Sequence, residues 1–134
     1  MSNAINVRWK WLTGMYVYTM LGAGGLGLGL LFKPDTIAKR FGWTGIDPVA
    51  LGIIGSMLLA FAVLSGLGLR SPLKFVPVLL LQLCYKTIWF IGVILPLLVK
   101  GQLPQQTIPL VIIYATYVVG DIIAIPFADV FAKE

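Results

Sequence analysis

The chain has 134 residues, of which 59% are hydrophobic and only 11% are charged, and its mean hydropathy is +0.96. A soluble domain carries roughly a quarter of its residues as charges, so this composition excludes an ordinary soluble domain and indicates an integral membrane protein. The net charge is +5. Because the basic residues fall on both sides of the apolar runs, we assign them to lipid headgroups and expect the lipid bilayer, and no nucleic acid, as a partner.

Four apolar runs divide the chain, and each is long enough to cross a hydrocarbon core of ~30 Å, which needs ~20 helical residues. The connections between them are short, so consecutive helices should be antiparallel neighbours. We therefore predict an all-α, integral membrane four-helix bundle that forms a single domain over residues 1–134. The predicted helices cover residues 11–32, 48–69, 72–99 and 107–131.

Capping residues mark two of the predicted helix starts. Asp47 followed by Pro48 combines an N-cap with a proline at the first helical position, a pairing that favours helix initiation. Ser71 and Pro72 repeat the pattern, and we expect them to start the third helix. Prolines near helix ends, which we expect to act as kinks or exits, are Pro77, Pro96 and Pro126.

The first connection, KPDTIAKRFGWTGID, has a helical pattern of its own. Asp35 or Thr36 can cap a short helix that places Ile37 opposite Lys39, and Gly42 would end it. We expect this helix to lie flat at the membrane interface, with a plain polar loop as the equal alternative.

The Lys and Arg counts on the two sides of the membrane are nearly balanced. Arg8 and Lys10 lie directly before the first helix, and residues flanking the first helix usually dominate orientation. We therefore expect an uncleaved first helix and both termini in the cytoplasm.

Metal and haem chemistry is excluded by residue content, and we expect no cofactor. The sequence contains no His, its single Cys is Cys84, and no acidic cluster is present to bind a cation. We expect Cys84 to be a small core residue.

Small residues recur at four-residue spacing on the first two predicted helices and predict close helix packing. They are Gly25 and Gly29 on the first helix, and Gly52, Ser56 and Ala60 on the second. We expect the two helices to pack through these faces, with formation of a homodimer or a larger membrane complex as the alternative use.

Lys86 and Asp121 are charged residues in the middle of predicted helices three and four. Counted from the connection between these helices, both lie ~20 Å from the same surface, so they are level in antiparallel helices. A lone charge at the bilayer centre costs ~2.5 to 3.5 kcal/mol. We therefore predict that Lys86 pairs with Asp121.

Further polar and aromatic residues fall near the depth of this pair and predict a small polar pocket lined by aromatic rings. Trp89 lies three residues after Lys86 and could stack beside the cation. The others are Gln82 on helix three, Tyr114 and Tyr117 on helix four, and Thr19 and Tyr16 on helix one.

Two hypotheses about this pocket have equal weight. The polar group either fixes the register between helices, or it binds a small amphipathic molecule, since intramembrane ionisable residues mark functional sites by default. A partner membrane subunit is a further candidate for what the protein binds. Proton-coupled transport of a small molecule is an alternative function. A membrane-embedded enzyme is the weakest candidate, because no nucleophile motif or cofactor fingerprint accompanies Lys86 and Asp121.

The Gly-rich first helix ending in LLFKP, followed by FGW and DPVALGIIGS, resembles the broad group of DoxX-like small four-helix bacterial membrane proteins. The resemblance covers most of the chain and rests on glycine spacing and helix count. It implies a bacterial inner-membrane protein in a group linked with quinone or sulfur redox chemistry. It assigns no role to Lys86 or Asp121.

Overall fold

The computed structural model describes residues 7–43 and 45–133. Four helical spans in these residues are long and apolar enough to cross a membrane, which confirms the predicted all-α bundle and indicates an integral membrane protein. The single-domain prediction for residues 1–134 includes residues 1–6, 44 and 134, which lie outside the described residues. In chain order the elements are α1 (Trp9–Phe32), α2 (Pro34–Arg40), α3 (Pro48–Arg70), α4 (Val76–Trp89), the π-helical η1 (Phe90–Ile94), α5 (Leu95–Val99), the 3-10 turn η2 (Gln105–Thr107), α6 (Ile108–Ala124) and α7 (Phe127–Val130).

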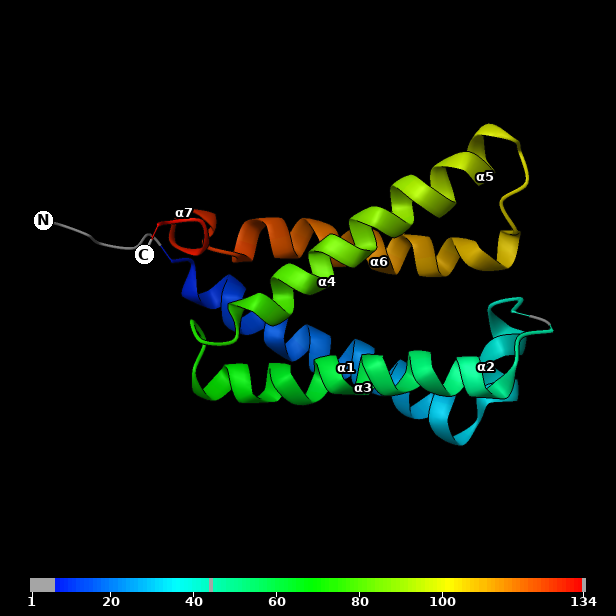
Figure 1. The fold of residues 1–134 in the computed structure, drawn as a ribbon, viewed down its shortest axis with the longest axis horizontal. Helices are drawn as coiled ribbons and strands as arrows, with labels where there is room; N and C mark the ends of the chain where they lie inside the picture. Colours follow the sequence, from blue (N-terminus) through cyan, green and yellow to red (C-terminus); the bar gives the residue numbers. More distant parts are fainter. Residues whose placement is uncertain (1–6, 44, 134) are drawn as a thin grey trace, which may run out of the picture.

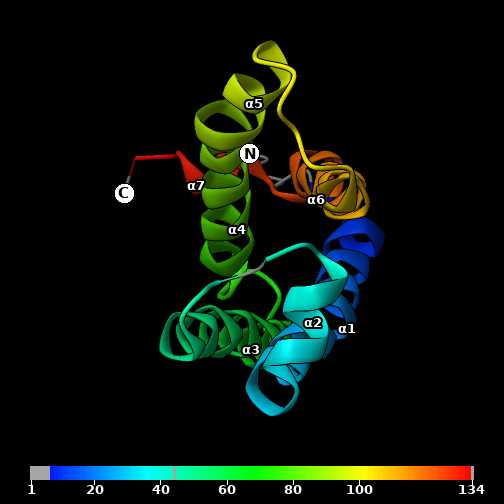
Figure 2. The same cartoon turned by 90° about the vertical axis from the view of Figure 1, so that its right-hand side faces the viewer.

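The four spans run side by side along the long axis of the molecule, and successive spans alternate in direction (Figure 1). The start of α1 and the short α7 lie at one end, while α2 and the connection from α5 to α6 lie at the other. Figure 2 shows α1 and α3 together below α4 and α6. The contact between α1 and α3 is the most extensive, and α6 contacts both α1 and α4. Toward α5, the α4 span diverges from α3 in both views.

The start of α3 is as predicted. Asp47 is the N-cap, its carboxylate accepts a hydrogen bond from Val49 N at 2.7 Å, and Pro48 occupies the first turn. The side-chain oxygen thereby satisfies one of the backbone N–H groups that have no partner within the helix.

The third span starts later than predicted. Ser71 ends α3, and residues 71–75 form the turn that reverses the chain before α4 begins at Val76. Pro77, rather than Pro72, therefore lies in the first helical turn. No kink is needed at Pro77, because backbone N–H groups in the first turn have no helical acceptor.

Pro96 disturbs the third span, as expected, through a π-helical segment. In η1 the hydrogen bond from Leu95 N goes to Phe90 O, five residues back. A proline ring clashes with the carbonyl four residues earlier, here Gly92, and widening the preceding turn by one residue relieves such a clash. The continuation, α5, has no buried residue.

The fourth span ends earlier than predicted, at Ala124 rather than residue 131. Ile125 is extended (φ −71°, ψ 125°), the conformation favoured for a residue that precedes proline, here Pro126. Arg8 Nη1 donates to Ile123 O at 2.7 Å and satisfies one of the free carbonyls at this helix end. The remaining predicted residues form the turn and α7.

The predicted short helix after the first span is confirmed as α2, although its start differs. Neither Asp35 nor Thr36 caps it, because Pro34 is already its first residue. Gly42 ends it with a left-handed φ of 73°, and Trp43 N donates at 2.7 Å to the carbonyl five residues earlier. This arrangement is a Schellman motif, for which glycine is the favoured residue.

Helices α1 and α3 pack through small residues, but not through the predicted ones. A Cβ added to Gly27 would lie 2.8 Å from the Gly55 carbonyl oxygen, and one added to Gly24 would lie 3.2 Å from the Ala62 Cβ. The backbones therefore approach as closely as the absence of side chains allows.

The predicted small-residue faces are rotated away from this contact. Additional Cβ atoms at Gly25 or Gly52 would meet nothing within 4 Å, Ser56 and Ala60 are exposed, and Gly29 faces Ile37 of α2. Four-residue spacing occurs on more than one face of a glycine-rich helix, so spacing alone does not select the packing face.

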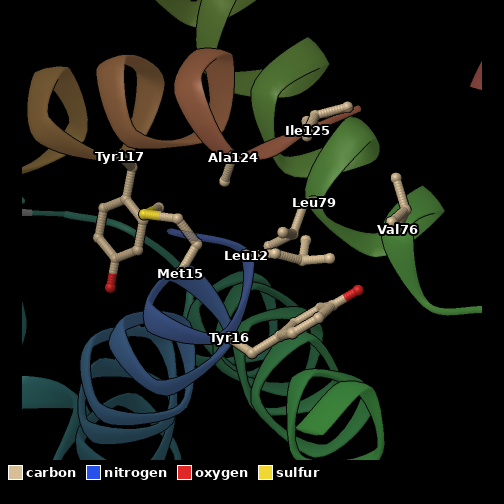
Figure 3. Close-up of a cluster of buried hydrophobic side chains, with 8 residues drawn as sticks. All are labelled: Leu12, Met15, Tyr16, Val76, Leu79, Tyr117, Ala124 and Ile125. Carbon is tan, nitrogen blue, oxygen red and sulfur yellow. The ribbon is translucent and has the colours of Figure 1, made fainter. Parts of the chain in front are cut away.

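Two apolar clusters fill the interior. One lies near α2 and joins α1, α2, α3 and α4 through residues such as Leu30, Leu51 and Leu58. The other fills the half of the bundle nearer the termini and is shown in Figure 3. In this terminal cluster Tyr16 is fully buried, and its hydroxyl donates to Pro72 O at 2.5 Å. The remaining members are Leu12, Met15, Val76, Leu79, Tyr117, Ala124 and Ile125.

We predict that Gly27→Ala destabilises the protein, whereas Gly25→Ala does not. Alanine favours a helix over glycine by about 0.5 to 1 kcal/mol, so the substitution at Gly25, which has open space, should be neutral or stabilising. At Gly27 the new methyl group would push against the backbone of α3, and overpacking of this kind costs ~1 to 3 kcal/mol. Thermal unfolding of both variants in the same detergent is the measurement. Equal melting temperatures would contradict the packing.

Candidate functional site

Lys86 lies in the interior of the bundle, with 2% of its surface exposed. The buried positions of α4 recur every three or four residues, and Gln82 and Lys86 continue the stripe that begins at Val76. The helical period therefore carries the lysine to the same side as the core residues.

Three tyrosine rings surround the Lys86 ammonium group. Its Nζ lies 4.6 Å from the ring centroid of Tyr85, 4.5 Å from that of Tyr114 and 4.4 Å from that of Tyr117. Nζ also donates to the Tyr85 hydroxyl at 2.9 Å. Aromatic faces are negative and attract a cation within ~6 Å, so this cage stabilises the charged lysine where water is excluded.

Tyr117 is fixed in place from α1. Its ring stacks on Tyr18 with centroids 4.1 Å apart and planes at 6°, and its hydroxyl donates to the Tyr18 carbonyl at 2.8 Å. Gly22 makes room for that hydroxyl, since any Cβ there would overlap it. The Tyr18 hydroxyl in turn shares a hydrogen bond of 2.6 Å with Thr116 Oγ1. The cage, which is built from α4 and α6, is therefore also held by a third helix, α1.

Asp121 is completely buried and is held by Gln82. The Gln82 amide Nε2 lies 3.1 Å from Asp121 Oδ2 and 3.4 Å from Oδ1, and it also contacts Thr19 Oγ1 at 3.2 Å. These three residues, here called the Gln82 network, connect α1, α4 and α6. Its members come from three helices, so it fixes their relative depth.

Lys86 and Asp121 do not form the predicted direct ion pair. No salt bridge with an N···O distance of 4.0 Å or less joins them, since Nζ is directed to the tyrosines and the carboxylate to Gln82. The amide of Gln82, one turn before Lys86, reaches the carboxylate instead. That the two charges compensate each other across the bundle stays a prediction.

The structure brings four of the other predicted site residues to the two charged residues and places two elsewhere. Gln82 contacts both Asp121 and Thr19, and Tyr114 and Tyr117 contact Lys86, as described above. Trp89 does not stack on the cation: it packs against Tyr114 with centroids 5.1 Å apart and planes at 63°. Tyr16 belongs to the terminal cluster, and its hydroxyl is directed to the turn after α3.

Sequence reasoning missed Tyr85 and Tyr18. Neighbouring residues do not share a face of a helix, so Tyr85 was not associated with Lys86, although the long lysine side chain reaches its hydroxyl. The signal available was the YK dipeptide within an apolar span. Cys84 was expected in the core and is exposed on the outer face of α4.

A cavity of about 130 Å³ adjoins the cage. Its walls come from the halves of α1, α3 and α6 nearest α2, and Phe41 contributes from the connection after α2. Lys86 is the only charged residue in the described lining. The apolar walls include Ala23, Leu26, Leu58 and Leu110. Toward the termini the interior is filled by the terminal cluster, which includes Leu12 and Leu79 (Figure 3).

Two buried polar atoms in the described residues have no hydrogen-bond partner: Gln82 Oε1 and Ser65 Oγ. Burial of an unpaired polar atom costs about 1 to 3 kcal/mol. The polar interior is therefore not fully satisfied by the protein's own groups. Within the same residues, no three His, Cys, Asp or Glu side chains converge in a way that could hold a metal ion.

Comparisons with protein-family models, curated proteins and solved structures give no match to this chain.

We predict that the charges of Lys86 and Asp121 are energetically coupled although they do not touch. Lys86→Met removes the one buried cation among the described residues and leaves the carboxylate uncompensated, so it should lower the melting temperature in detergent. Adding Asp121→Asn removes that charge and keeps a side chain that can bind Gln82, so the double variant should recover part of the loss. A double variant that loses as much as the two single variants combined would show that the charges act independently.

Proposed function

We propose that this integral membrane protein binds a small amphipathic molecule in the cavity, with the polar head of the molecule at Lys86. The observation that carries this proposal is a buried ammonium group that, among residues 7–43 and 45–133, contributes the only charge to an apolar cavity and has no carboxylate within salt-bridge distance. Ligand sites commonly combine apolar walls with a few polar groups that fix orientation. Intramembrane ionisable residues are functional sites by default.

A purely structural role for this polar group is less well supported. A register-fixing group is stable when each member is satisfied by another member. Here Lys86 and Asp121 are turned to different partners, and Gln82 Oε1 is unpaired. The Gln82 network can fix helix register by itself, which leaves the caged lysine free for a second role.

Binding of a partner membrane subunit is the second candidate, and a different surface favours it. Small residues at Gly25, Gly52, Ser56 and Ala60 lie on outer faces of α1 and α3 and contribute nothing to the packing between them. Such faces permit close approach of another helix within a bilayer. Both candidates agree with the resemblance to DoxX-like proteins and with a place in a bacterial inner membrane.

We predict that Leu26→Trp abolishes retention of a bound small molecule, whereas Leu21→Trp does not. Leu26 lines the cavity, so the larger ring would occupy the space of the ligand. Leu21 lies on the same helix but is 72% exposed, so it serves as the matched control. Native mass spectrometry of protein extracted in a mild detergent measures what is retained.

The result expected is a small molecule on the wild type and on Leu21→Trp only. Equal retention by both variants, or a wild type without any bound molecule, would contradict the cavity proposal. A protein that co-purifies in place of a small molecule would support the second candidate. Melting temperatures of both variants verify that each is folded.

We also predict that both termini face the cytoplasm and that the connection between α5 and α6 faces the opposite side. The ends of the described chain lie at one end of the bundle, and Arg8 and Lys10 flank the first helix (Figure 1). Terminal fusions to a fluorescent protein should be bright, and terminal fusions to alkaline phosphatase should be inactive. Active phosphatase at the C-terminus would overturn the orientation or the number of spans.

A further inference from the structure

The chemistry of the cavity lining restricts what it can bind. An ammonium group has three N–H donors, and the one hydrogen bond from Lys86 goes to the Tyr85 hydroxyl. The remaining donors face Tyr114, Tyr117 and the cavity that these rings line. The lining therefore supplies a cation and hydrogen-bond donors, and its described residues include no acidic group.

Asp121, the one buried carboxylate in the described part of the chain, does not form a salt bridge with this cation. Both carboxylate oxygens of Asp121 accept hydrogen bonds from the Gln82 amide, and Asp121 does not line the cavity. Since the protein does not place its own anion on Lys86, a ligand anion can take that position. A hydrogen bond between two charged partners is roughly twice as strong as a neutral one, and the low dielectric of the interior increases the difference.

The size of the cavity limits the rest of the ligand. An apolar cavity of ~150 Å³ in a protein core accommodates benzene, and the cavity beside Lys86 is of similar size, about 130 Å³. This volume suits one ring or a short branched chain. It does not enclose a phospholipid headgroup or a long acyl chain. Aromatic walls from Phe41, Tyr114 and Tyr117 favour a flat ring.

We infer that the ligand is a compact organic acid: a carboxylate carried on a single ring or a short branched chain. The carboxylate accepts hydrogen bonds from Lys86 Nζ, and the apolar part fills the space between Leu26, Leu58 and Leu110. This inference rests on the proposed cavity-binding function and adds the charge and size of the ligand.

The experiment compares three probes of one shape on the full chain in lipid nanodiscs: benzoate, benzyl alcohol and benzylammonium. Displacement of radiolabelled benzoate measures the affinity of each. Benzoate should bind at least about tenfold more tightly than benzyl alcohol, and benzylammonium should not compete. Equal affinities for benzoate and benzyl alcohol would overturn the inference.

Two variants of Lys86 test whether this residue causes the preference for an anion. Lys86→Met should remove the preference, while Lys86→Arg should keep part of it, because a cation is retained. Retention of the full preference by Lys86→Met would overturn the assignment. Because Lys86→Met can lose stability, Lys86→Arg and the comparison of probes on the wild type test the inference independently of it.

Two further arms separate this inference from the proposal on which it rests. If benzyl alcohol binds as well as benzoate, and Leu26→Trp blocks both while Leu21→Trp blocks neither, the cavity proposal stands and the anion preference is wrong. If none of the probes binds in a way that Leu26→Trp prevents, the cavity proposal itself fails. Decanoate that binds more than tenfold more tightly than benzoate would overturn the size limit and indicate a lipid-derived acid.

Discussion

The burial of one ammonium group in an apolar interior is the constraint on which the rest of the structure depends. A charge at this depth costs several kcal/mol unless the protein supplies compensation. Here the groups in direct contact with the cation are three ring faces and one hydroxyl. Rings are bulky, so the helices that carry them cannot close tightly around the lysine, and space remains beside it. The cavity and the cage therefore have the same physical origin.

The two layers of the bundle, α1 with α3 and α4 with α6, differ in how their helices pack. Helices α1 and α3 meet backbone to backbone at Gly27 and Gly55, and their contact is the most extensive between the described helices. On the other side, α4 crosses obliquely and departs toward α5, where no residue is buried (Figure 1). In addition to the apolar terminal cluster, the Gln82 network connects α4 and α6 to α1. The candidate site lies between the two layers, since α4 and α6 supply the lysine and its cage while α1 and α3 supply apolar walls of the cavity.

The sequence predicts the parts of this fold that depend on local chemistry. Uninterrupted apolar runs gave the number of spans, and Asp47 and Gly42 gave helix ends because their effects involve only neighbouring backbone groups. The rotation of each helix about its own axis cannot be predicted in this way, since it depends on the helix that packs against it. For this reason the predicted packing faces of α1 and α3 and the predicted stacking of Trp89 on the cation were wrong. Lys86 was predicted to pair with Asp121 but donates to Tyr85. The depth of a residue in the membrane can be predicted by counting residues along the helix, whereas the direction in which its side chain points around the helix axis cannot.

The positions of the cage residues along the chain have a consequence for biogenesis. Synthesis proceeds from the N-terminus, so α4, which carries Lys86, reaches the bilayer before α6 has been made. Until then the lysine lacks Tyr114, Tyr117 and Asp121, and only the high hydropathy of its own span, 2.0 on average, favours insertion. The hairpin of α1 and α3 contains no intramembrane charge and can assemble first. Completion of the fold therefore depends on the last span, and a chain truncated before α6 leaves a buried cation without its cage.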